Sequence, residues 1–146
     1  MVADDLAFPN GMAVTPDNAT LLVAESHRCR LTAFDIGPKG DLSGRRVWAD
    51  LGDDAPDGIC LDTVGAAWYA SVPGRHCVRV REGGEVLAVV DLPQGGYACM
   101  LGGSKQPTLY ATIADWPGMA QAATSASWNG RVVAVPVSTP QAGWPG

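Results

Sequence analysis

The sequence predicts an all-β protein built from repeated units of roughly 40–45 residues. The pair Asp-Leu recurs at residues 5–6, 50–51 and 91–92, and each copy precedes a similar series of short apolar runs. These runs are rich in β-branched and aromatic residues, and turn sequences such as Glu82-Gly83-Gly84 separate them. The 18 glycines and 11 prolines of the 146 residues favour many turns over a helical bundle. Four short strands in a unit of this length are typical of a β-propeller blade.

Each unit can be divided into its expected strands. The first unit is expected to contain Pro9–Val14, Leu21–Ala24, Arg30–Ile36 and Arg46–Leu51. The second is expected to contain Pro56–Leu61, Ala67–Ala70, Val78–Arg81 and Glu85–Leu92. The third is expected to contain Gly96–Leu101, Leu109–Thr112 and Arg131–Val137, with no fourth strand. We therefore expect one partial propeller domain over residues 1–146, with blades at about 7–51, 52–92 and 93–137.

The first residues are expected to belong to a further blade. Val2–Leu6 resembles Val47–Leu51 and Val89–Leu92, which are the outermost strands of their units. We expect residues 1–6 to be the outer strand of a preceding blade whose other strands are absent. Since propellers close with roughly four to eight blades, three blades should not close a ring alone.

Composition excludes several classes of protein. The net charge is −5 and the only lysines are Lys39 and Lys105, so the chain lacks the basic surface that nucleic-acid binding needs. Its apolar runs are too short to span a membrane as a helix. No secretory signal is visible, and the four cysteines form no C-x-x-C pair, so we expect buried, reduced thiols in a cytoplasmic protein.

Candidate site residues begin the inner strand of each unit. Asn10, Asp57 and Tyr97 hold equivalent positions and should point toward the same mouth of the central channel. The Asn10 and Asp57 oxygens suit Ca²⁺, Mg²⁺ or Mn²⁺, with Zn²⁺ as a further alternative. The competing interpretation is that Asn10-Gly11 and Asp57-Gly58 are only turns.

The loops after the second strands should surround the same mouth. They carry candidate substrate-binding residues: His27 and Arg28 in the first unit, and Arg75 and His76 in the second. In the third unit this loop is a long insertion, 115–129, that includes Trp116, Met119 and Trp128 and could act as a lid. The four rim side chains could equally be solvated loop residues. No G-x-S-x-G, P-loop or H-E-x-x-H motif is present.

Several motifs together resemble one known family. They are Phe8–Asp17, Val23–Ser26, Leu31–Asp35, Pro56–Asp62 and Cys99–Gly103. These segments are similar to the senescence marker protein/gluconolactonase/luciferin-regenerating enzyme family, and the similarity runs over nearly the whole chain. The resemblance implies a six-bladed propeller that hydrolyses sugar-type lactones or esters. It also implies one bound divalent cation, for which Ca²⁺ is the first expectation.

The resemblance also implies roles for two residues. Asn10 matches the family's metal-binding Asn, and Asp57 matches an Asp that binds metal and acts as general base toward water. This chain matches only the C-terminal half of such a protein, and the family's third metal ligand, a Glu, has no counterpart here. Two copies would hold six blades, so a homodimer that completes the ring is one hypothesis. The alternative is a non-catalytic half-propeller that acts as a binding or structural module.

Overall fold

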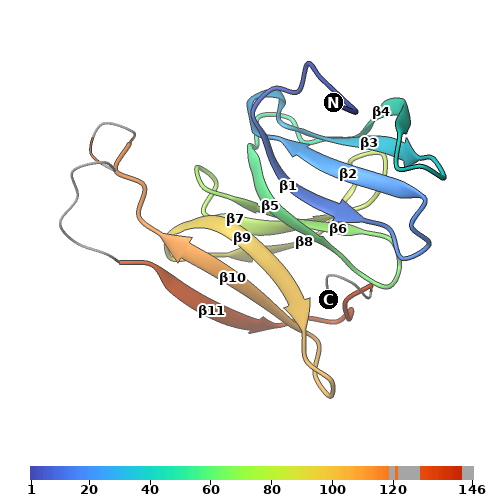
Figure 1. Ribbon diagram of the computed structural model, residues 1–146. Coiled ribbons are helices and arrows are strands. Elements are labelled where there is room, and N and C mark those ends of the chain that lie inside the picture. Colours follow the sequence, from blue (N-terminus) through green and yellow to red (C-terminus); the bar gives the residue numbers. More distant parts are fainter. Residues whose placement is uncertain (119–120, 122–128, 143–146) are drawn as a thin grey trace.

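The computed structural model describes residues 1–118, 121 and 129–142. Its strands form antiparallel sheets that we call blades 1, 2 and 3 (Figure 1). Blade 1 contains β1 (Pro9–Val14), β2 (Thr20–Glu25), β3 (Arg30–Ile36) and β4 (Leu42–Asp50), with a short 3₁₀ helix at Ser26–Arg28. Blade 2 contains β5 (Pro56–Leu61), β6 (Ala67–Ser71), β7 (His76–Val80) and β8 (Val86–Asp91). Blade 3 contains β9 (Gly95–Gly102), β10 (Thr108–Ala114) and β11 (Arg131–Pro136).

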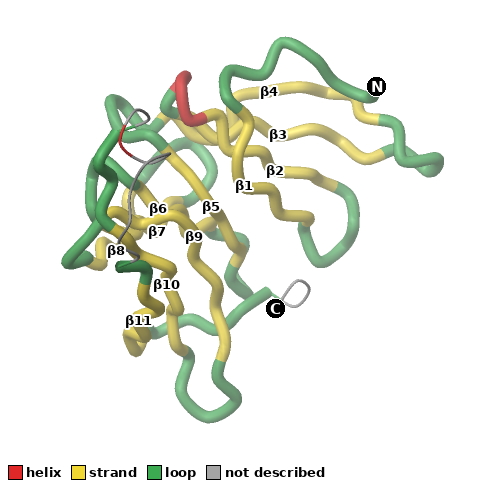
Figure 2. Tube along the Cα trace, turned by 60° about the vertical axis from the view of Figure 1, so that its left-hand side comes forward, coloured by secondary structure: helices red, strands yellow, loops and turns green. Residues whose placement is uncertain are grey.

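The predicted all-β half-propeller is confirmed. Strand order within each sheet follows the chain, and the first strands β1, β5 and β9 are neighbours along the inner side of the assembly. Figure 2 shows the three sheets side by side around this inner side. The loops that precede β1, β5 and β9 therefore meet at one end of the molecule, together with the loops that follow β2 and β6.

The inner strands approach each other closely at two glycines. A Cβ atom on Gly11 would lie 2.6 Å from the Asp57 carbonyl oxygen, and one on Gly58 would lie 2.7 Å from the Ala98 Cα. Neither glycine is in a turn, because β1 and β5 include them. The turn interpretation of Asn10-Gly11 and Asp57-Gly58 is therefore wrong: these glycines allow neighbouring blades to touch.

The hydrophobic core lies between the sheets. One cluster joins blades 1 and 2, with Leu22, Leu31 and Trp48 packed against Tyr69 and Val80. A second cluster joins blades 2 and 3 and includes Cys60, Trp68, Cys77, Cys99, Leu101, Leu109 and Ile113. All four cysteines are free, as predicted, and all but Cys29 are buried.

The expected outer strand at Val2–Leu6 does not form within this chain and stays a prediction. Residues 1–6 have no regular structure, although the rest of the chain forms strands close to the expected ranges. A strand forms only when a neighbouring strand accepts its backbone hydrogen bonds, and none of the three sheets of the described residues pairs with this segment. The third sheet correspondingly ends at β11.

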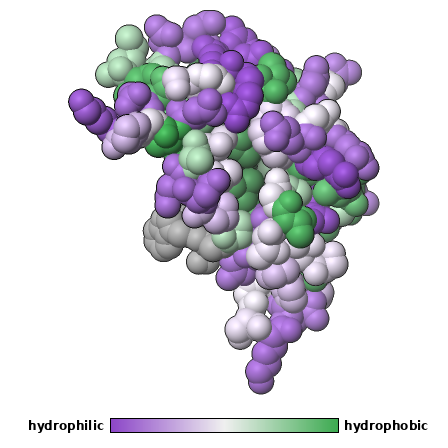
Figure 3. Space-filling model, turned by 90° about the vertical axis from the view of Figure 1, so that its right-hand side faces the viewer, coloured by the Kyte–Doolittle hydropathy of each residue, from purple (hydrophilic) through white to green (hydrophobic). Residues whose placement is uncertain are grey.

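The outer surface is mixed in polarity. Figure 3 shows hydrophilic residues over much of one face, with hydrophobic residues gathered in a hollow near its middle. No helix within the described ranges is long and apolar enough to cross a membrane.

Candidate functional site

Two of the predicted site residues meet at the mouth of the inner channel. Asn10 in β1 and Asp57 in β5 both line a cavity of about 930 Å³. The Asn10 amide lies beside the Asp57 carboxylate and favours its charged form. The fold produces this contact because each residue precedes the glycine at which two inner strands touch.

The Asp57 carboxylate lies in an unusual electrostatic environment. Burial raises the pKa of Asp57 above its ordinary value, and the Asn10 amide opposes part of that increase. Burial acts in this direction because removing water penalises the charged form of an acid. The carboxylate is consequently a better proton acceptor than one in bulk water.

Tyr97 enters the same cavity from the third inner strand. It lies in β9 and occupies the repeat position of Asn10 and Asp57. Burial raises its pKa first, and the negative charges of Asp57 and Asp115 raise it further. Tyr97 is therefore a neutral phenol at physiological pH, able to donate one hydrogen bond.

Two of the four predicted rim residues line the cavity. The ring of His27 stacks on Phe8 with centroids 4.5 Å apart and an interplanar angle of 17°. The Arg75 guanidinium also lines the cavity and donates a hydrogen bond to the Pro93 carbonyl oxygen. The aromatic contact and the Pro93 contact hold both groups at the wall.

The other two rim residues are not brought to the cavity. Arg28 forms ion pairs with Asp5 and with the buried Glu25. His76 Nε2 lies 2.5 Å from Asp54 Oδ2, and the same carboxylate accepts hydrogen bonds from Tyr69 and Ser71. Both side chains connect loops to strands, and neither lines the cavity as the sequence analysis expected.

The cavity also contains residues beyond the predicted metal-binding and substrate-binding ones, among them Trp116 of the insertion. Ser26 lines it and donates a 2.6 Å hydrogen bond to the Pro56 carbonyl oxygen. Phe8, Asp115 and Trp116 complete the side facing blades 1 and 3. Of the insertion residues, Met119 and Trp128 lie outside the described residues. Phe8 and Ser26 could have been predicted to line the cavity, because they lie close to Asn10 and His27 in the sequence.

The donor set at the mouth fits part of a hard-cation site. An amide and a carboxylate side chain line the cavity there, and Ca²⁺, Mg²⁺ and Mn²⁺ prefer the oxygen ligands that both groups carry. No three His, Cys, Asp or Glu side chains in the described ranges are placed to hold a metal ion together. Ca²⁺ takes roughly six to eight ligands, so Asn10 and Asp57 would supply only some of them.

Comparison with known proteins gives this geometry a context. The chain is 32% identical to regucalcin of Xenopus laevis, over 77% of this chain and 42% of that protein. It is 27% identical to 6-deoxy-6-sulfogluconolactonase of Pseudomonas putida, over 80% of this chain and 45% of that protein. The chain therefore spans less than half the length of these relatives.

Solved structures show the same fold. A luciferin-regenerating enzyme superposes with a TM-score of 0.79 at 20% identity, over 97% of this chain and 49% of that one. A gluconolactonase of Xanthomonas campestris gives a TM-score of 0.65 at 32% identity, over 76% of this chain and 36% of that one. Residues 1–115 match the family described as the SMP-30/Gluconolactonase/LRE-like region. The chain belongs to this family.

Proposed function

We propose that this chain carries one half of the active site of a divalent-cation-dependent lactone hydrolase. The observation that carries the proposal is the pair Asn10 and Asp57, which lie in neighbouring inner strands and both line the 930 Å³ cavity. The family supports the reaction class, because the relatives include gluconolactonases. The substrate class is a sugar-type lactone, a cyclic ester with several hydroxyl groups.

Asn10 and Asp57 are the residues that would hold the cation. When bound, a divalent cation supplies a Lewis acid that polarises an ester carbonyl and lowers the pKa of a water molecule. Both donors are hard oxygens, so Ca²⁺ is the expected ion, and Mg²⁺, Mn²⁺ and Zn²⁺ are the alternatives.

Asp57 would handle the proton of the reaction. Its carboxylate accepts a proton from water while the water oxygen forms a bond to the lactone carbonyl carbon. The ring C–O bond then breaks, and the departing oxygen takes the proton back from Asp57. The product is a hydroxy acid.

The cavity walls would orient the substrate. Arg75 and Tyr97 present donors for lactone and hydroxyl oxygens, and the stacked His27 ring adds one nitrogen at the rim. Trp116 provides an apolar surface on which a sugar ring can pack.

The rival function is a non-catalytic binding module. It is favoured by the absence, in the described part of the chain, of a cluster of three acidic, His or Cys metal ligands. It predicts no turnover of lactones at any cation concentration.

Two matched variants decide between the proposals. Asp57→Asn should abolish lactone hydrolysis and weaken Ca²⁺ binding by at least tenfold, because it removes the base and the charged ligand. Asp53→Asn changes an exposed side chain on the loop before β5, outside the cavity, and should leave both unchanged. Glucono-lactone hydrolysis is followed by pH-stat, above the uncatalysed rate, with each cation in turn, and calorimetry measures Ca²⁺ binding. Equal activity in the two variants, or none in the wild type, would contradict the proposal.

A further inference from the structure

Three exposed side chains on blade 3 occupy positions that are buried in both preceding blades. Met100, Tyr110 and Val132 are 37%, 42% and 68% exposed. Strand pairing places them at the repeat positions of buried residues: Ala13, Leu22 and Leu31 in blade 1, and Cys60, Trp68 and Cys77 in blade 2. In blades 1 and 2 the next blade covers these positions. Blade 3 therefore presents the surface of a blade–blade interface without its neighbour.

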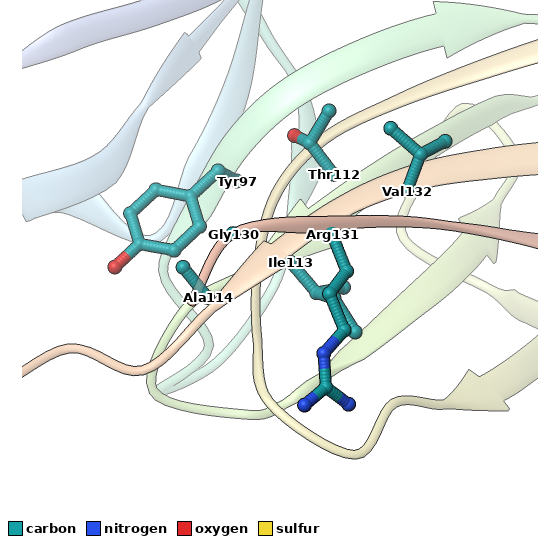
Figure 4. A pocket seen from close by; sticks show the side chains of 7 residues that line it. All are labelled: Tyr97, Thr112, Ile113, Ala114, Gly130, Arg131 and Val132. Atoms are coloured by element: carbon teal, nitrogen blue, oxygen red, sulfur yellow. The ribbon is translucent and has the colours of Figure 1, made fainter. Parts of the chain in front are cut away.

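The orientation of this surface is visible at one end of the sheet. Figure 4 shows Thr112 and Val132 pointing to one side, and Ile113 and Arg131 pointing to the other. The first side includes part of a surface hollow of about 450 Å³. Ile113 is buried against blade 2, so Thr112 and Val132 face away from the rest of the chain.

Blade 1 is also uncovered, on the face that the other blades turn toward the preceding blade. Met12 is 63% exposed, whereas Ile59 and Cys99, at the same repeat position, are buried against the preceding blade. Within the described residues, blade 1 is thus uncovered on the face opposite blade 2, and blade 3 on the face opposite blade 2.

Among the described residues, blade 3 has no fourth strand, and residues 1–6 resemble a fourth strand but join no sheet. In the described part of the chain, β11 is an edge strand, so blade 3 lacks the fourth strand that blades 1 and 2 have. Residues 1–6, whose sequence resembles a fourth strand, lie outside any sheet. Arg45 holds this segment against blade 1 by hydrogen bonds to the backbone oxygens of Asp4 and Asp5, and Arg28 also binds Asp5.

We propose that a second copy of this chain covers both ends, forming a two-fold symmetric dimer of six blades. Blade 3 of each copy packs against blade 1 of the other, and residues 1–6 pair with β11 of the partner as its fourth strand. Two identical junctions close the ring, as an isologous pair of chains requires. Closure would also cover the unpaired β11 edge, which otherwise invites aggregation.

The dimer would also complete the cation site, a consequence that rests on the proposed function. Two Asn10 and two Asp57 side chains would face one channel, which doubles the oxygen donors available to an ion. The interface itself does not depend on catalysis, so its test uses the mass of the particle and not its activity.

Substitution of matched valines tests the surface. Val132→Arg places a charge in the proposed interface, while Val64→Arg places the same charge in a turn where the valine is equally exposed, at 71%. Light scattering should give twice the 15.2 kDa chain mass for the wild type and for Val64→Arg, and one chain mass for Val132→Arg. A wild-type monomer would overturn the proposal and leave these faces to blades of another chain. A dimer that persists in Val132→Arg, or a polydisperse oligomer, would overturn it as well.

Proline substitutions test the strand pairing. Alternate amides of a strand point to opposite edges, and proline removes one of them. Ala3→Pro and Asp4→Pro should therefore differ in effect. One of them should raise the dimer dissociation constant, measured by sedimentation, at least tenfold, and the other should raise it much less. If neither changes it, residues 1–6 are not the fourth strand of the partner's sheet.

Discussion

The two end blades have the same repeat but treat their outward faces differently. On blade 1, the outward face carries Glu25, fully buried among Arg28, Arg30, Arg45 and Thr32. On blade 3, the strand residues of the outward face are uncharged: Ala98, Met100, Tyr110, Thr112, Val132 and Ala134. Blade 1 is thus stabilised within the chain by charge-assisted hydrogen bonds, while blade 3 leaves apolar surface to be covered from outside.

The sharpest test of this difference is the aromatic residue that blades 2 and 3 share at one repeat position. Trp68→Ala should destabilise the chain by roughly 3–5 kcal/mol, because Trp68 is buried between blades. Tyr110→Ala should cost only about 1 kcal/mol, since its ring has no neighbouring blade. Urea unfolding in the Val132→Arg chain measures both without a contribution from association. Equal costs would mean that blade 3 is already covered.

Removing the buried charge tests the face of blade 1. Glu25→Gln leaves Arg30 and Arg45 without their carboxylate and should cost roughly 3 kcal/mol in the free energy of unfolding. The control is Glu85→Gln, whose 3.3 Å pair with Arg81 is exposed, and which should cost at most about 0.5 kcal/mol. A small effect at Glu25 would show that blade 1 does not depend on the cluster.

Acid should weaken the same face. Hydrogen bonds from Ala7, Thr32 and Arg30 outweigh burial and lower the pKa of Glu25 from 4.5 to about 2. A lowered pKa stabilises the fold above the unfolded value, and this contribution is lost as pH falls from about 4.5 to about 2. The loss should approach 3 kcal/mol, at about 1.4 kcal/mol per pKa unit. Unfolding curves between roughly pH 6 and pH 2.5 should show this loss of unfolding free energy in the wild type. The loss should be smaller in Glu25→Gln.

The smallest effect is expected where the N-terminal segment touches blade 1. Asp5→Ala removes an exposed ion pair with Arg28, 3.2 Å long, and should cost less than about 1 kcal/mol. Urea unfolding should show this small loss. No loss would mean that the backbone contacts of Arg28 and Arg45 hold the segment without the ion pair.

The repeat itself carries the information that predicts the strands and the meeting of Asn10 with Asp57. The strands were found because alternating apolar residues and turns recur at one period. The meeting of Asn10 with Asp57 was predicted because equivalent positions of neighbouring blades must lie side by side. Neither inference needed any side-chain partner to be known.

The positions of two other side chains depend on partners that the sequence does not identify. Arg28 and His76 were expected at the cavity, but Glu25 and Asp54 bind them. The glycines after Asn10 and Asp57 also read as turn residues, because the sequence does not show the backbone of the next blade.

The close contact at Gly11 and Gly58 also bears on the shape of the channel. The third inner strand has Ala98 at this position, and its methyl group adds width where the glycines add none. In a ring of two chains, the junctions within each chain would be narrow, while those between chains would be held wider by Ala98. The bore of such a ring would therefore be oval and not round.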